Sequence, residues 1–149
     1  MKAQIFILLA LVAGGLLSLQ GAINANLGKA MGNPFHAGFV SFAVGLLTAF
    51  AGLYVTGARL PAMTNLMGHP WYLYVGGALG VIYVTSVLML IPKLGAANVV
   101  LAVFLGQIVA SMLIDHFGLL GLARVPMDWY RAGGAGLMLA GLYLVQYRA

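Results

Sequence analysis

Three polar residues recur at every fourth position of the apolar stretch LGQIVASMLIDHFG, residues 105–118. They are Gln107, Ser111 and Asp115. Residues four apart lie on one face of a helix, so an amide, a hydroxyl and a carboxylate would form one polar row. Such a row can hydrogen-bond a polar solute, and its carboxylate can pair with a cation or exchange a proton.

The members of this row differ in their expected depth in a membrane. Counted from Gly95, Gln107 lies about 18 Å along a helix, near the middle of a bilayer. Its amide needs a partner there, so it either joins two helices or lines a cavity. Asp115 lies about 30 Å along, at the membrane surface, where most of the cost of a charge disappears. It acts there as an anchor paired with Arg124 or Arg131, or as a gate with weak ion linkage.

A second polar patch occurs in LQGAINANLG, residues 19–28. Gln20 and Asn24 lie one turn apart on a predicted helix, and Asn26 and Lys29 follow in a predicted loop. Tyr83 could line a cavity or could pack between helices, whereas Thr85 and Ser86 are expected to bond back to the preceding turn. The residues expected to contact a solute are Gln20, Asn24, Tyr83, Gln107 and Ser111.

The composition requires that these residues sit in a membrane protein. Of the 149 residues, 63% are hydrophobic and 6% are charged. A soluble chain of this size could not bury so much apolar surface. Five apolar runs of about the length that crosses a bilayer predict a single all-α domain, 1–149, with spans at 4–24, 35–56, 71–91, 95–115 and 131–147. The five prolines all fall between these runs, as expected if the helices are unbroken.

Small residues at regular spacing indicate where these helices pack. Lipid provides no hydrophobic drive for helix association, so close approach at small residues matters. Packing is the favoured interpretation, and helix sliding during transport is the alternative. The expected packing residues are Gly14, Ser18, Gly45, Gly76, Gly80 and Gly136.

The basic residues are nearly balanced across the membrane. Five spans place Lys2, Arg59, Arg124 and Arg131 on one side, and Lys29, Lys93 and Arg148 on the other. Because the bias of lysine and arginine sets orientation, this small difference favours dual topology, in which copies insert both ways up. A fixed topology is the alternative. An antiparallel dimer would supply the two oppositely oriented repeats that commonly enclose a site at the membrane midplane.

Several chemistries have no residues to carry them. The chain has no cysteine, only two acidic residues, and dispersed histidines without metal-ligand spacing. No phosphate-binding loop and no nucleophile–base pair is present, so neither an enzyme nor a cofactor or metal site is expected. The seven basic residues are scattered singly and flank apolar runs, which excludes a nucleic-acid site.

Three stretches carry a family resemblance: QGAINANLGKAMGNPFHAGFVSFAVG, GGALGVIY with LIPKLGAANV, and GQIVASMLIDHFGLLG. They resemble the YdcZ-like family of small bacterial inner-membrane proteins, within the drug/metabolite transporter superfamily. The resemblance covers nearly the whole chain and implies an exporter-like transporter with that superfamily's fold. It also implies pairing, as an antiparallel homodimer or as a heterodimer with a related five-span chain.

One departure bears on the substrate. The related small multidrug resistance proteins use a glutamate in the first helix to bind cation and proton, and this chain has Gln20 and Asn24 there instead. A neutral or anionic small solute therefore fits better than an organic cation. The hypothesis is a small-solute exporter whose substrate binds near mid-membrane between the subunits of an antiparallel dimer. The alternatives are an interaction subunit that does not transport, a channel and a lipid flippase.

Overall fold

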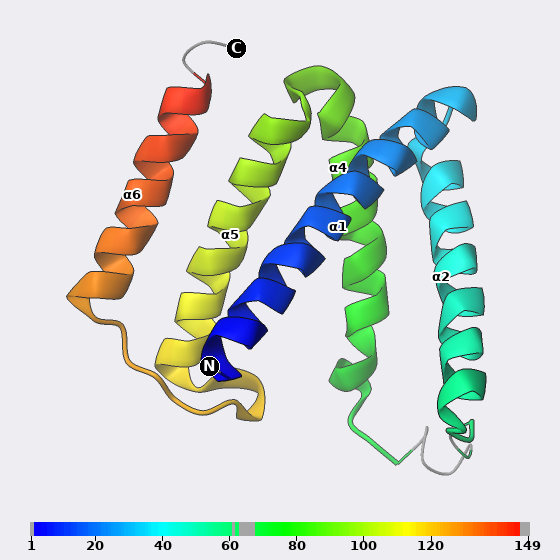
Figure 1. Ribbon diagram of the computed structural model, residues 1–149, viewed down its shortest axis with the longest axis horizontal. Helices are drawn as coiled ribbons and strands as arrows, with labels where there is room; N and C mark the ends of the chain where they lie inside the picture. Colours follow the sequence, from blue (N-terminus) through cyan, green and yellow to red (C-terminus); the bar gives the residue numbers. More distant parts are fainter. Residues whose placement is uncertain (1, 61, 63–67, 147–149) are drawn as a thin grey trace. The chain divides into compact units, whose positions relative to one another are not determined.

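The computed structural model describes residues 2–60, 62 and 68–146, and this part of the chain is built of helices (Figure 1). Two short 3₁₀ helices, η1 (Trp71–Tyr74) and η2 (Leu119–Gly121), accompany the long ones. The α-helices of the described residues are α1 (Lys2–Ala30), α2 (Pro34–Thr56), α4 (Val75–Leu94), α5 (Ala96–Phe117) and α6 (Trp129–Gln146). The predicted all-α class is therefore confirmed.

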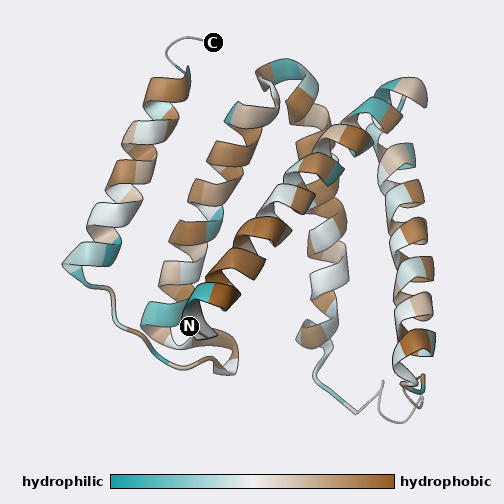
Figure 2. Ribbon diagram, viewed as in Figure 1, coloured by the Kyte–Doolittle hydropathy of each residue, from teal (hydrophilic) through white to brown (hydrophobic). Residues whose placement is uncertain are grey.

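Within the described residues, four segments are long and apolar enough to cross a membrane: Gln4–Ala30, Pro34–Thr56, Trp71–Leu94 and Ala96–Phe117. Figure 2 shows the apolar colour recurring along these helices. The shorter helix α6 is not among the four, because Trp129, Tyr130 and Arg131 occupy its first turn. A fifth span at 131–147 stays a prediction, and its expected end at Tyr147, with Arg148 beyond, lies outside the described residues, as does Pro61.

Two expected boundaries were wrong. Helix α1 continues to Ala30, so Asn26 and Lys29 lie on its last turns instead of in a loop. Polar side chains near a helix end reach the membrane surface and do not stop the helix. Pro92 lies inside α4 rather than beyond it. Pro92 has no N–H to donate to the carbonyl of Leu88, and its ring crowds that carbonyl. The helix ends two residues later.

A short turn at residues 31–33 connects α1 to α2 and is fixed by local chemistry. Asn33 is the N-cap of α2, and its side-chain oxygen accepts a hydrogen bond of 2.8 Å from the backbone N–H of Phe35. Pro34 takes the first helical position, where its missing N–H would have no partner in any case. The sequence Asn–Pro therefore turns the chain back along α1.

The chain divides into two compact units, residues 1–93 and 94–149. In the first, α1, α2 and α4 pack around Ala25, Ala37 and Leu88, which are all at most 4% exposed. Gly21 faces α4, since a Cβ added there would contact two of its side chains, 3.4 Å from Ile91 Cδ1 and 3.5 Å from Val87 Cγ1. The buried core thus joins the C-terminal halves of α1 and α4 to the start of α2.

The second unit contains α5, η2 and α6. Helix α5 ends at Phe117, and its C-cap Gly118 has a left-handed backbone (φ 62°) and donates a hydrogen bond from its N–H to the carbonyl of Asp115. A Cβ at Gly118 would lie 3.3 Å from that of Arg124, so glycine also lets the following loop fold back on the helix end. This loop leads to α6.

Candidate functional site

The most enclosed polar contact of the first unit joins α1 to α2. Asn24 is 7% exposed, and its Nδ2 donates a hydrogen bond of 2.9 Å to Ser41 Oγ. Both residues lie within helices apolar enough to span a membrane. A neutral amide–hydroxyl pair meets its hydrogen-bonding needs there without placing a charge in hydrocarbon.

A cavity of about 400 Å³ lies next to this pair and is formed by α1, α2 and α4. Its lining residues are Gln20, Ser41, Phe42, Gly45, Leu46, Ala49 and Val84. Gln20 lies ten residues before the end of α1, which is about 15 Å from that end and close to the middle of a bilayer core. The cavity combines an apolar wall with two neutral polar groups, as small-solute sites commonly do.

A second, much smaller cavity of about 20 Å³ lies between α1 and α4. Its polar lining residues are Gln20, Asn24 and Tyr83, and Gln20 also lines the larger cavity. This volume suits a single water molecule, and three polar side chains are enough to hold one. The structure therefore brings three of the five expected solute-contacting residues around one small space.

Thr85 adds a buried polar atom to this unit. It is 5% exposed, and within the described residues its Oγ1 has no hydrogen-bond partner. A Cβ added to Gly38 of α2 would lie 3.5 Å from that oxygen. The prediction that Thr85 bonds back to the preceding turn was wrong, whereas Ser86 does so, donating to the carbonyl of Ile82 at 2.8 Å. Leaving a buried hydroxyl without a hydrogen-bond partner lowers the stability of the folded chain by about 1–3 kcal/mol.

The other expected residues lie on α5, in the second unit. Gln107 and Ser111 are exposed on this helix, and Asp115 near its end is partly buried. An exposed amide on a helix that spans a membrane still needs a hydrogen-bonding partner.

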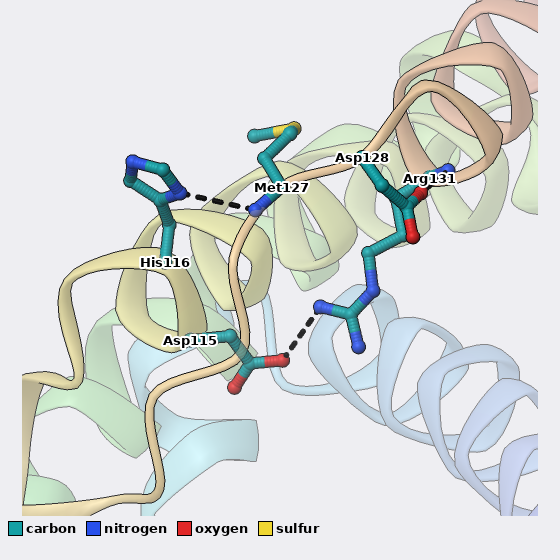
Figure 3. Close-up of polar contacts among 5 residues, drawn as sticks. All are labelled: Asp115, His116, Met127, Asp128 and Arg131. Carbon is teal, nitrogen blue, oxygen red and sulfur yellow. Dashed lines mark hydrogen bonds and ion pairs between the residues drawn. The ribbon is translucent and has the colours of Figure 1, made fainter.

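Asp115 belongs to a set of polar contacts at the end of α5 (Figure 3). Its Oδ2 lies 3.3 Å from Arg131 Nη1, and each of the two side chains is 35% exposed. Of the two arginines that the sequence offered as partners of Asp115, Arg131 therefore forms the ion pair. Arg124 Nε donates to the carbonyl of His116 at 3.0 Å instead.

The loop before α6 is held by the same helix end. His116 Nδ1 accepts a hydrogen bond from the N–H of Met127 at 3.0 Å, and the N–H of Val125 donates to the carbonyl of Asp115. Asp128 then caps α6 by accepting from the N–H of Arg131 at 2.8 Å. Charges therefore gather where two helices end and the chain can reach water.

The expected packing residues fall into two groups. A Cβ at Gly80 would lie 3.4 Å from the ring of Phe42, and Ser18 donates to the carbonyl of Gly14 within α1. In contrast, a Cβ at Gly45, Gly76 or Gly136 would meet no described heavy atom within 4 Å. The packing role expected of all six residues stays a prediction.

Several residues of the first unit did not emerge from the sequence. Ser41, Phe42 and Gly21 are the clearest of them. Ser41 carries a usable signal, because it is a lone polar residue in the apolar run FVSFAVG, as Gln107 is in its own run. Phe42 and Gly21 carry none, since their roles depend on which helix faces them.

The charged side chains of the first unit are all basic. Residues 1–93 contain no aspartate or glutamate, so no carboxylate of this unit can attract a cation or carry a proton. Among the described residues, no group of three His, Cys, Asp or Glu could hold a metal ion.

A family model described as "Putative inner membrane exporter, YdcZ" matches residues 5–144. The match covers both units and every residue of the polar contacts described above. No curated protein and no solved structure matches the chain.

Proposed function

The chain belongs to the YdcZ family, and from this premise we propose that it exports a small neutral solute through the cavity beside Asn24 and Ser41. The family is one of inner-membrane transporters rather than enzymes, and the chain is a multi-pass protein of that membrane. The observation that carries the proposal is the hydrogen bond between Asn24 and Ser41, next to a cavity of about 400 Å³.

The chemistry of the cavity supports a neutral solute. Gln20 and Ser41 offer donors and acceptors without a net charge, and residues 1–93 contain no acidic side chain. A cation would enter an apolar cavity with nothing to offset its lost hydration. A neutral polar solute loses less and regains hydrogen bonds from the amide and the hydroxyl.

We propose that the complete site is shared by two chains in an antiparallel dimer. Gln107 and Ser111 are exposed on a span and need polar partners, which a second subunit can provide. The open space at Gly76 and Gly136 leaves room for close helix approach from that subunit. In this arrangement the solute contacts Gln20, Asn24, Tyr83, Gln107 and Ser111, α6 is the fifth span, and rocking gives alternating access.

Asp115 stays outside the binding site in this proposal. Its ion pair with Arg131 joins the end of α5 to the start of α6. It anchors this junction at the mouth of the dimer, and its release from Arg131 would act as a gate.

Transport is tested with purified protein in liposomes that contain an equimolar pool of amino acids, polyols, nucleosides and small carboxylates. Mass spectrometry follows the loss of each solute. We expect at least one neutral solute to leave faster than from protein-free liposomes, and Ser41→Ala to slow that loss about tenfold by removing a contact of roughly 1.4 kcal/mol. Ser86→Ala is the matched control, because Ser86 bonds only to its own helix. Equal release by Ser41→Ala and the original protein would exclude this cavity as the route.

The antiparallel arrangement has its own test, because the chain lacks cysteine. Single cysteines replace Met31, between α1 and α2, and Ala58, after the opposite end of α2. With dual topology, a membrane-impermeant maleimide added to spheroplasts labels about half of each variant. Full labelling of one variant and none of the other would contradict dual topology.

A further inference from the structure

A third cavity lies at one end of the first unit, and neither Asn24 nor Ser41 is among its lining residues. Its volume is about 310 Å³, and Lys29 and Lys93 are among its lining residues. The apolar part of its wall includes Ala25, Pro34, Leu88 and Met89. An apolar wall with two ammonium groups matches a ligand that is itself apolar at one end and anionic at the other.

The helix ends place this cavity at a membrane surface. Lys29 lies in the last turn of α1 and Lys93 in the last turn of α4, and both helices belong to candidate spans. Pro34, at the start of α2, lines the same cavity, so α1 and α4 end on the side where α2 begins. Lipid headgroups lie at this depth.

The charge at this end is not balanced within the unit. Residues 1–93 contain no acidic side chain, and the one ion pair found among the described residues joins Asp115 to Arg131. The C-termini of α1 and α4 each contribute roughly half a negative charge, while the N-terminus of α2 contributes roughly half a positive one. The two lysines therefore leave a net positive charge beside an apolar wall.

We propose that this cavity binds an anionic phospholipid, with its phosphate between Lys29 and Lys93 and the start of an acyl chain against Leu88 and Met89. The site does not depend on the proposed transport function. It would favour anionic over zwitterionic lipid and would hold the α1–α2 turn and the end of α4 at the headgroup level.

The test uses the full chain in nanodiscs of equal parts phosphatidylglycerol and phosphatidylcholine, followed by native mass spectrometry of the lipids retained. Each lysine near an anionic surface contributes about a fivefold preference, so we expect the double variant Lys29→Gln/Lys93→Gln to lower the retained ratio of phosphatidylglycerol to phosphatidylcholine about 25-fold. The double variant Lys29→Arg/Lys93→Arg keeps both charges and should keep the ratio. Each single lysine-to-glutamine variant should lower the ratio about fivefold. The single variants test the proposal if the double variant does not fold.

The matched control is Arg59→Gln, which removes one charge from the loop after the opposite end of α2. Arg59 is not among the residues that line this cavity, so its loss should lower the ratio less than the loss of either lysine. Three results would each overturn the proposal. They are equal retention of both lipids by the original protein, an equal loss in Arg59→Gln, and displacement of phosphatidylglycerol by millimolar inorganic phosphate, which would indicate a site for free anions.

Discussion

The first unit joins its helices through buried side chains, whereas the second joins α5 to α6 through polar contacts at helix ends. In the first, Ala25, Ala37 and Leu88 are buried and the enclosed polar pair, Asn24 with Ser41, is neutral. In the second, no described residue of α6 is buried, and Asp115 pairs with Arg131 where both are partly exposed. Hydrocarbon accepts a neutral hydrogen bond but penalises a charge, so each kind of contact lies where its cost is lowest.

The sharpest way to break this comparison is to place a charge in the first unit. Asn24→Asp puts a carboxylate on a buried site within a span, and we expect it to lower the free energy of unfolding by about 3 kcal/mol. Gln146→Glu, an exposed position at the end of α6, should change it little. Denaturant titration in mixed micelles measures the free energy of unfolding of both variants. Equal losses of stability would mean that the depth of a charge in the membrane does not determine its energetic cost.

Close packing should also distinguish the units. Gly21→Leu forces a large side chain between α1 and α4, where Ile91 would lie 3.4 Å from the new Cβ, and should cost about 2 kcal/mol. A Cβ added at the exposed Gly136 of α6 would have no neighbouring atom within 4 Å, so Gly136→Leu should leave the free energy of unfolding of the single chain unchanged. The free energies of unfolding of the two variants are compared at a dilution that separates subunits. A large loss of stability in Gly136→Leu, with none in Gly21→Leu, would show that close packing lies in the second unit instead of the first.

The neutral pair should contribute less than either of these changes. Asn24→Ala, Ser41→Ala and the double variant form a thermodynamic cycle, and we expect a coupling free energy of about 1 kcal/mol. The same micelle titration gives this value. Zero coupling would show that the Asn24–Ser41 hydrogen bond does not stabilise the first unit.

The ion pair of the second unit should give the smallest effect. Both side chains are 35% exposed, so Asp115→Asn or Arg131→Gln should cost less than about 1 kcal/mol, and salt should reduce the difference. Asp128→Asn should be neutral, because asparagine also caps a helix. A loss in Asp115→Asn that is large and independent of salt would indicate that this charge acts as a buried group.

The sequence predicted the class of protein and most helices because apolar length alone specifies a membrane span. It placed Pro92 outside its helix and Asn26 in a loop, because the prediction ended each helix where its apolar run ended, whereas α4 continues to Leu94 and α1 to Ala30. It identified Gln20, Asn24 and Tyr83 as polar candidates, but the contact with Ser41 depends on the rotation of α2 against α1. The sequence offered two arginines, Arg124 and Arg131, as partners of Asp115. Which of them forms the ion pair depends on the path of the loop between α5 and α6.

The central claim is that the neutral cavity of the first unit is a solute site that water reaches. Cysteine in place of Ser41 tests it most directly, because a thiol reacts with a charged methanethiosulfonate only where water allows it to ionise. Phe39→Cys is the control on the same helix, about 3 Å away in depth, at a side chain that is 77% exposed on the outer surface of α2. We predict that in liposomes Ser41→Cys reacts about tenfold faster than Phe39→Cys. A difference of roughly 1.4 kcal/mol between the free energies of ionisation of the two thiols gives this ratio. Equal rates, or no reaction at Ser41→Cys, would contradict the account.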